Sequence, residues 1–278
     1  LELIVVDNAS SDGSANLVAD LHPAARVVRN PVNEGFGAAN NRAFELASGS
    51  VWLLLNPDAV LEADALGHLL SFLASHPRAG AAAPAIASPG HGAAESCGMA
   101  PGLRSAIGHF LFVNRLLPDD RGGAWRGFQL HRRKDLRPRR VDWASAAALA
   151  LRPAAVRAVG GFDPSFFLYG EDVDLGERLG RAGWDVWLVP SARAHHLIAA
   201  SQGGISTRWL DGIHAVYARR ANRAGTVAFA LVIALGLSLR AAMASLPRAG
   251  ASRLHADRMR AASFRALRLA RRSLATGA

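Results

Sequence analysis

Cysteine is almost absent from this chain of 278 residues, because Cys97 is the only one. A single cysteine excludes an internal disulfide and any metal site built from several cysteines. Half of the residues (50%) are hydrophobic, which excludes global disorder and provides for a sizeable core. The simplest prediction is a folded protein in a reducing, cytoplasmic compartment.

Lysine is equally scarce, since Lys134 is the only one although the formal net charge is +10. The positive charge is therefore carried by arginine, and it is concentrated in residues 240–278, which contain nine arginines and one acidic residue, Asp257. Basic tails bind nucleic acid or anionic lipid, or form a solvated surface. No nucleic-acid-binding module or aromatic-interleaved basic platform is recognisable, so we expect no nucleic-acid partner.

Internal repeats, low-complexity tracts and a secretory signal are also lacking. The uncharged apolar run over residues 224–239 has 16 residues, fewer than the roughly 20 that a membrane-spanning helix needs. Beyond it, a loose apolar stripe with arginines around it could lie on an anionic membrane surface. Three alternatives stay open: packing on the preceding domain, packing on a second subunit (a homo-oligomer), and a transmembrane hairpin. The stripe consists of Ala256, Met259, Phe264, Leu267, Ala270 and Leu274.

Short apolar runs alternate with helix-like segments in the first part of the chain. "LELIVVD" and "VWLLLNPD" are typical of buried strands, and residues 13–22 and 37–48 between them have helical spacing. This alternation predicts an α/β fold with a mixed, mostly parallel sheet flanked by helices. We further expect a helix over 64–77, a strand over 79–87, an irregular excursion over 88–140, a strand in 184–196, and helices after 206.

Two predicted strands end in acidic residues, Asp7 and Asp58. Ligands of open parallel sheets bind beyond the carboxyl ends of the strands, although Asn56-Pro57-Asp58 is also ordinary turn chemistry. "GFGAAN" lacks the third glycine of a dinucleotide loop. His195 and His196 close another strand-like segment and are either structural or metal-binding.

Four acids occur within residues 171–177 of this basic chain. The spacing Asp174–Arg178 and Glu177–Arg181 predicts two solvated ion pairs, each worth about 0.2–0.5 kcal/mol. Asp172 instead shares a helix face with Leu175 and Leu179. An inward carboxylate at a helix start is either an N-terminal cap or a working acid/base.

The order of five motifs resembles the inverting glycosyltransferases of family 2, and most of all their rhamnosyltransferase-like branch. The motifs are "VVDNASSDGS", "NEGFGAANN", "LLLNPDAVL", "GGFDPSFFLYGEDVDLGERLGRAGW" and "VPSARAHH". The resemblance covers about residues 1–200 and implies a Rossmann-like, nucleotide-sugar-binding fold of the GT-A type. It also implies that one strand and helix of the family precede the region that matches residue 1.

The resemblance implies a role for each matching residue. Asp172 would be the catalytic base, with Trp143 and Glu171 in the acceptor region, and Asp58 and His196 would bind Mg²⁺ or Mn²⁺. The nucleotide and donor sugar would be bound by Asp7, Asn8, Ser10, Asp12, Gly35, Asn40, Asn56 and Ala146. Ala146 and Ala43 stand where the family commonly has glycine.

These residue types suit sugar transfer. A departing nucleoside diphosphate develops negative charge, which a hard divalent cation on carboxylate oxygen can neutralise. The attacking hydroxyl must lose a proton, and a positioned carboxylate accepts it. We therefore expect transfer of a sugar, with rhamnose the leading choice, from a nucleoside-diphosphate sugar to a cell-wall, polysaccharide or lipid-linked acceptor.

Two other classes stay open at this level: a sugar-nucleotide nucleotidyltransferase and a truncated, inactive relative. The expected organisation is a catalytic domain over residues 1–205, without the first strand–helix unit of the family, and a basic helical region over 206–278. The expected location is the cytoplasm, with peripheral binding to the inner face of the cell membrane as an option.

Overall fold

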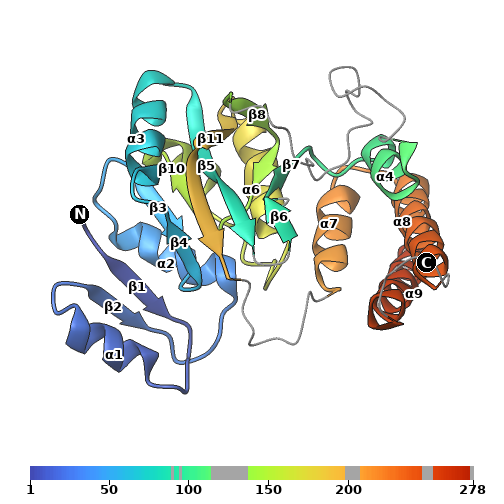
Figure 1. Cartoon of the computed structure of the whole chain (residues 1–278), viewed down its shortest axis with the longest axis horizontal. Coiled ribbons are helices and arrows are strands. Elements are labelled where there is room, and N and C mark those ends of the chain that lie inside the picture. The colour runs from blue at the N-terminus through green and yellow to red at the C-terminus, as the bar shows by residue number, and fades with distance from the viewer. Residues whose placement is uncertain (89–90, 94–95, 114–136, 198–206, 246–252, 276–278) are drawn as a thin grey trace. The chain divides into compact units, whose positions relative to one another are not determined.

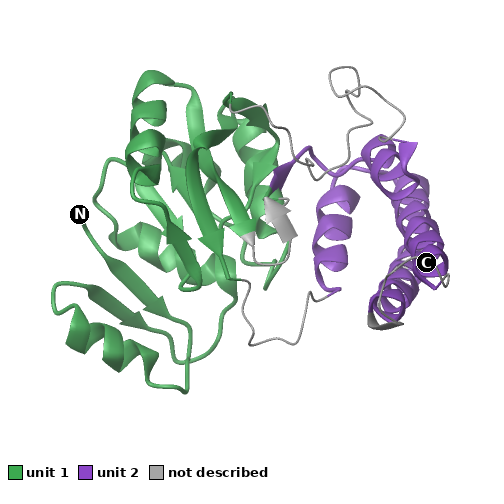
Figure 2. Cartoon of the chain, viewed as in Figure 1, with its two compact units in different colours: residues 1–96, 132–199 green, residues 97–131, 200–278 purple. Residues whose placement is uncertain are grey.

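The computed structural model describes residues 1–278 except 89–90, 94–95, 114–136, 198–206, 246–252 and 276–278 (Figure 1). The chain forms two compact units (Figure 2). Unit 1 comprises residues 1–96 and 132–199, and unit 2 comprises residues 97–131 and 200–278. The predicted domain boundary at residue 205 stays a prediction. The compact units are divided differently, because unit 2 includes residues 97–131 together with the C-terminal helices.

Unit 1 begins with a small parallel sheet. Strands β1 (Ile4–Asp7) and β2 (Arg26–Arg29) pair in parallel, and α1 (Ser14–Leu21) connects them. Helix α2 (Phe36–Leu46) follows and contacts β1. Among the described strands, β1 pairs only with β2. The predicted first strand and the two helices after it are confirmed, whereas the sequence pattern did not predict β2 between those helices.

A seven-stranded sheet forms the centre of unit 1, with the order β3–β10–β5–β11–β4 and with β6 and β8 paired to β5 and β11. Its strands are β3 (Trp52–Leu55), β4 (Ala59–Leu61), β5 (Ala79–Ser88), β6 (His91–Ala93), β8 (Arg139–Val141), β10 (Ala148–Leu151) and β11 (Asp185–His196). The short strand β9 (Trp143–Ala144) precedes β10.

The α/β class and the mixed sheet are confirmed, but the pairing is less parallel than the alternation indicates. Of the paired neighbours in this sheet, only β5 and β11 run in parallel. β10 lies antiparallel between β3 and β5, and β4 lies antiparallel to β11. β10 therefore runs in the direction opposite to both β3 and β5.

Small side chains let helices pack closely on this sheet. α3 (Ala65–Ser75) buries Leu69, Phe72 and Leu73 against alanines of β5 and β10. α5 (Pro153–Val159) and α6 (Glu171–Arg181) complete the unit. At Gly80 an added Cβ would lie 2.8 Å from the Cβ of Trp184, so this close approach requires glycine.

Unit 2 contains the short strand β7 (Cys97–Gly98) and the helices α4 (Leu103–Phe110), α7 (Trp209–Ala218), α8 (Arg223–Ala244) and α9 (Arg253–Ala275). The helices share a core that includes Phe110, Leu210, Phe229 and Ile233. Gly236 allows α4 to approach α8, because an added Cβ would lie 2.5 Å from Phe110 Cβ.

Helix α8 corrects the expectation drawn from its 16-residue apolar run. The helix has 22 residues, and Asn222 caps it by accepting a hydrogen bond from Gly225 N. By length and composition, α8 is the one described helix that could cross a membrane. The core helix of a soluble protein meets the same criterion.

Candidate active site

The two predicted metal ligands are neighbours in the structure. Ala59 of β4 pairs with His196, the last residue of β11, so Asp58 lies beside the end of that strand. Asp58 Oδ1 is 3.0 Å from His196 Nε2, and Leu197 N donates to Asp58 O at 2.9 Å. Both side chains remain partly exposed, at 28% and 22%. The pair is therefore accessible from solvent.

His195 lies next to the other histidine in sequence but has a different partner. Its Nε2 is 3.2 Å from Glu62 Oε1 in an exposed pair. Successive side chains of a strand point to opposite faces, which explains why the two histidines separate. The structure thus brings His196, and not His195, to Asp58.

A carboxylate and an imidazole can together hold a divalent cation. Mg²⁺ and similar ions are commonly bound by one or two protein side chains together with substrate phosphates. Among the described residues no group of three or more His, Cys, Asp or Glu side chains is arranged to hold a metal by itself. Asp58 and His196 therefore fit an ion that shares its ligands with a diphosphate.

Asn56 and Ala146 lie near this pair at the same end of the sheet. Asn56 N donates to Ala147 O at 2.9 Å, where β3 and β10 meet. Ala146 is buried, with 3% of its surface exposed. The methyl group that distinguishes it from glycine is therefore held inside the fold.

The predicted nucleotide-binding residues after β1 form a hydrogen-bonded loop. Asp7 Oδ1 accepts from Ser10 N at 3.0 Å, and exposed Asp12 accepts from the amide and hydroxyl of Ser14. These bonds from Ser14 lower the pKa of Asp12. Asn8 is central to the loop, because its amide bonds to Asn30, Asn33, Glu34 and Gly35. In this structure Asn8 orders the loop.

Gly35 and Asn40 lie at the start of α2. Gly35 has φ 89°, and an added Cβ would lie 2.5 Å from Phe167 O. The next residue, Phe36, donates its N–H to the same carbonyl at 2.9 Å. Asn40 Nδ2 donates to Phe36 O within the helix. The start of α2 is thereby joined to the segment that leads into α6.

Asp172 is the second residue of α6, and the cap position before it is taken by Gly170 with φ 98°. The prediction that Asp172 could be the N-terminal cap is therefore wrong. The side chain is half-buried, and its Oδ1 accepts from Val173 N at 2.8 Å. Burial raises the pKa of Asp172 to about 6, because desolvation outweighs the hydrogen bond from Val173.

Glu171 is more deeply buried, with 6% of its surface exposed. Its Oε2 has no hydrogen-bond partner among the described residues. Burial, and then the neighbouring charge of Asp172, raise the pKa of Glu171 to about 8. Burial and the charge of Asp172 thus both favour the protonated form of Glu171, and two carboxyls in such different surroundings can take different roles.

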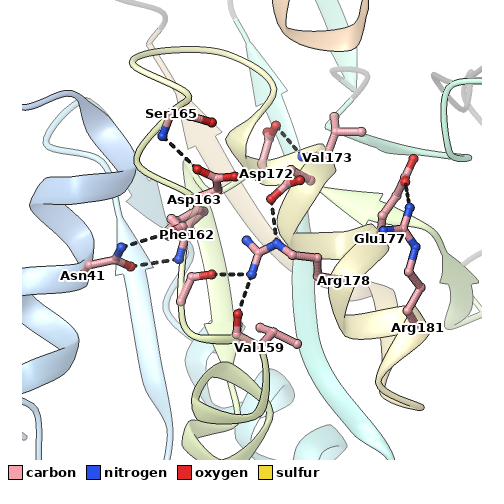
Figure 3. A network of polar contacts seen from close by, with 12 residues as sticks. Asn41, Val159, Phe162, Asp163, Ser165, Asp172, Val173, Glu177, Arg178 and Arg181 are labelled. Carbon is pink, nitrogen blue, oxygen red and sulfur yellow. Dashed lines mark hydrogen bonds and ion pairs between the residues drawn. The ribbon is translucent and has the colours of Figure 1, made fainter. Parts of the chain in front are cut away.

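The pair Asp174–Arg178 is not the solvated pair that its spacing indicates. Asp174 is buried at 5% exposure and accepts from Arg178 Nε at 2.7 Å. Arg178 Nη1 also donates to Val159 O and Gly161 O, both at 2.7 Å (Figure 3). In the second pair, Glu177 is also shielded, and only Arg181 is exposed. Through its bonds to Val159 O and Gly161 O, Arg178 fastens α6 to the end of α5 and the residues that follow it.

Trp143, predicted in the acceptor region, lies against α6. The residue is buried, and a Cβ added at Gly176 would lie 2.9 Å from its Cα. Asn41 was not predicted as a site residue, yet its side chain bonds twice to Phe162 in the loop before α6. The paired asparagines and the "GGF" motif were the only sequence signals of this contact.

Comparisons with known proteins identify the family to which the chain is similar. The family model "Glycosyl transferase family 2" matches residues 1–137. The chain is 33% identical over 219 residues to an N-acetylglucosaminyl-diphospho-decaprenol L-rhamnosyltransferase of Mycobacterium tuberculosis, covering 73% of this chain and 68% of that protein.

Two solved structures share the fold at low identity. GalNAc-T7 with UDP, GalNAc and Mn²⁺ superposes with a TM-score of 0.55 at 15% identity, covering 78% of this chain and 41% of that longer one. S. aureus TarS residues 1–349 with UDP gives 0.50 at 14% identity, covering 100% and 82%. The mixed sheet, its flanking helices and these matches assign a GT-A fold, and the chain belongs to glycosyltransferase family 2.

Proposed function

We propose that this glycosyltransferase moves rhamnose from a nucleoside-diphosphate sugar to a hydroxyl of a lipid-linked glycan acceptor, with inversion at the anomeric carbon. The choice of sugar and acceptor is supported by the mycobacterial relative, whose name specifies both. Nucleotides in the related structures support a nucleoside-diphosphate donor. The proposed location is the cytoplasmic side of the membrane, where such an acceptor is reached.

The observation that carries the mechanism is the half-buried Asp172, whose pKa is raised to about 6 by burial. A carboxylate of that pKa is ionised at neutral pH and still accepts a proton well. We assign to Asp172 the role of the base that accepts the proton of the acceptor hydroxyl while the hydroxyl oxygen attacks the anomeric carbon. Glu171, neutral beside it, can donate a hydrogen bond to the acceptor, and Trp143 supports this region from β9.

Asp58 and His196 would hold Mg²⁺ or Mn²⁺ at the other side of the reacting bond. The ion would neutralise the charge that develops on the departing diphosphate. Asp7, Ser10 and Asp12 follow β1, with Asn8 ordering their loop, and would bind the nucleoside. Gly35, Asn40, Asn56 and Ala146 would border the donor.

A donor screen tests this function. The protein would be incubated with Mn²⁺, a polyprenyl-diphosphate-linked N-acetylglucosamine and each nucleotide sugar, and products would be identified by mass spectrometry. We expect the acceptor to gain one deoxyhexose from thymidine-diphosphate rhamnose only. The Asp172→Asn variant is the matched control. Pyrophosphate exchange without sugar transfer would indicate a nucleotidyltransferase, and no turnover with any donor an inactive relative.

A further inference from the structure

Helix α8 carries a line of large apolar side chains that nothing in the described structure covers. Leu231, Leu235, Leu239 and Met243 are 46%, 53%, 43% and 51% exposed. Residues four apart lie on the same side of a helix, so the four form one stripe about 18 Å long. No charged residue interrupts it.

Helix α9 adds to the same surface. It runs antiparallel to α8, since Ser238 pairs with Ser263, Arg260 donates to Ser245, and Arg223 donates to Ser273 O. On α9, Phe264, Leu267 and Leu274 are 65%, 38% and 53% exposed. The predicted stripe is thereby divided, because Ala256 and Ala270 are buried and Met259 packs on the core.

The exposed apolar side chains lie outside the core that both helices share with α4 and α7. The buried sides pack on α4 and α7: Arg240 donates to Phe110 O and His109 O, Arg265 pairs with Asp211, and Ser273 contacts His214. We call the exposed surface the apolar face; it comprises Leu231, Leu235, Leu239, Met243, Phe264, Leu267 and Leu274.

Arginines border the apolar face along α9. Arg268 and Arg271 are exposed and alternate with Leu267 and Leu274. Asp257 is the single acidic residue of α9, and Arg260 pairs with it. Apolar side chains next to arginines match a bilayer surface, where the apolar groups enter the acyl region and the guanidinium groups meet anionic headgroups.

We propose that the apolar face docks on the surface of an anionic lipid bilayer, with α8 and α9 lying in its plane. This inference adds a membrane partner to the proposed function but needs no sugar transfer. A second copy of the chain fits the surface less well, because two-fold pairing would bring like-charged arginine rows together.

Lying on the membrane suits α8 better than crossing it. Its opposite side contributes Phe229, Ile233 and Leu237 to the core of unit 2. Arg240 is anchored on the backbone of α4, and the antiparallel partner α9 is rich in arginine. To span a bilayer, α8 would have to leave this core.

Vesicle co-sedimentation of the full chain tests the proposal. We expect binding to phosphatidylcholine vesicles that contain phosphatidylglycerol, and weak binding to phosphatidylcholine alone. Leu235→Glu with Leu239→Glu should weaken binding by at least about tenfold, since two inserted apolar groups are replaced by anions. Leu70→Glu is the matched control, because Leu70 is an exposed leucine (41%) on the apolar helix α3.

Two further measurements test separately the contribution of the arginines and the insertion of the apolar face into the bilayer. Arg268→Gln and Arg271→Gln should each weaken binding about fivefold, and high salt should release the wild type. A solvent-sensitive fluorophore on Leu235→Cys, but not on Leu70→Cys, should shift to the blue with anionic vesicles. This readout works even if the glutamate variants fold poorly.

Three results would overturn the proposal: equal vesicle binding by the Leu235→Glu/Leu239→Glu variant, resistance to carbonate extraction, and a lipid-free dimer that this variant dissociates. The second result would mean that α8 spans the membrane, and the third that the face is a subunit interface. None of these readouts measures sugar transfer, so failure here is distinguishable from failure of the proposed function.

Discussion

Asn41 binds both backbone groups of Phe162, a residue 121 positions away. Its Nδ2 donates to Phe162 O and its Oδ1 accepts from Phe162 N, both at 2.8 Å (Figure 3). Gly161 is required beside it, because φ is 74° and an added Cβ would lie 2.4 Å from Asn41 Oδ1. Together with Arg178, this contact fixes the loop that leads to Asp172.

Asn41→Ala should lower the free energy of unfolding by about 1–3 kcal/mol, since the amide and carbonyl of buried Phe162 lose their partner. Asn40→Ala is the matched control on the same helix, because Asn40 donates only within α2. Urea unfolding of both variants measures the difference. Equal losses of stability would contradict a specific role for Asn41.

Asp174→Asn should be clearly destabilising, by about 1–3 kcal/mol, because it leaves the shielded guanidinium of Arg178 without its counter-charge. The exposed pair Asp257–Arg260 offers the comparison, and Asp257→Asn should change stability by less than about 0.5 kcal/mol. Thermal unfolding would show the contrast. A small loss of stability in the Asp174→Asn variant would support the original prediction of a solvated pair.

Asp172→Asn should reduce turnover by about 10²–10⁴-fold while leaving donor binding intact, because only the proton-accepting oxygen is lost. The wild-type rate should rise with pH through about 6, where Asp172 ionises, and then level off. Below that value it should fall about tenfold per pH unit. Near-normal sugar transfer by the variant would contradict the assignment of Asp172 and favour Glu171 as the catalytic base.

Glu171→Gln should flatten the pH dependence of stability. The folded pKa of about 8 lies above the ordinary value of 4.5, so the folded state holds a proton that the unfolded state has released. Stability attributable to Glu171 is therefore present below pH 4.5 and is lost as the pH rises toward about 8. We expect the glutamine variant to melt several degrees higher at pH 8, with little difference at pH 4. An unchanged profile would mean that Glu171 is ionised at neutral pH.

Asp58→Ala should abolish most of the Mn²⁺-dependent binding of a nucleoside diphosphate, and His196→Ala should weaken it less, by roughly tenfold. His195→Ala is the control, because that side chain faces Glu62 in an exposed pair. Calorimetric titration with and without Mn²⁺ gives the readout. Wild-type binding by both Asp58→Ala and His196→Ala would exclude the metal site.

The sequence by itself determined the fold class and the chemical types of the candidate site. The short apolar runs at Ile4–Asp7 and Trp52–Leu55 form strands, as their local hydrophobic pattern predicts. The alternation of such strands with helices can also be recognised from the local pattern, without knowledge of contacts between distant segments. The order of motifs likewise directed attention to Asp58, Asp172 and His196. Local pattern was sufficient for these features.

Only the tertiary structure decided which faces are buried and which partners meet. The spacing of Asp174 and Arg178 suits a solvated pair, yet Arg178 is held inward by the carbonyls of Val159, at the end of α5, and of Gly161. Tertiary contacts also decide the burial of the 16-residue apolar run, whose residues lie partly on the buried side and partly on the exposed side of α8. Burial depends on contacts between segments distant in sequence, and the helical period shows only which residues share a face, not what that face meets.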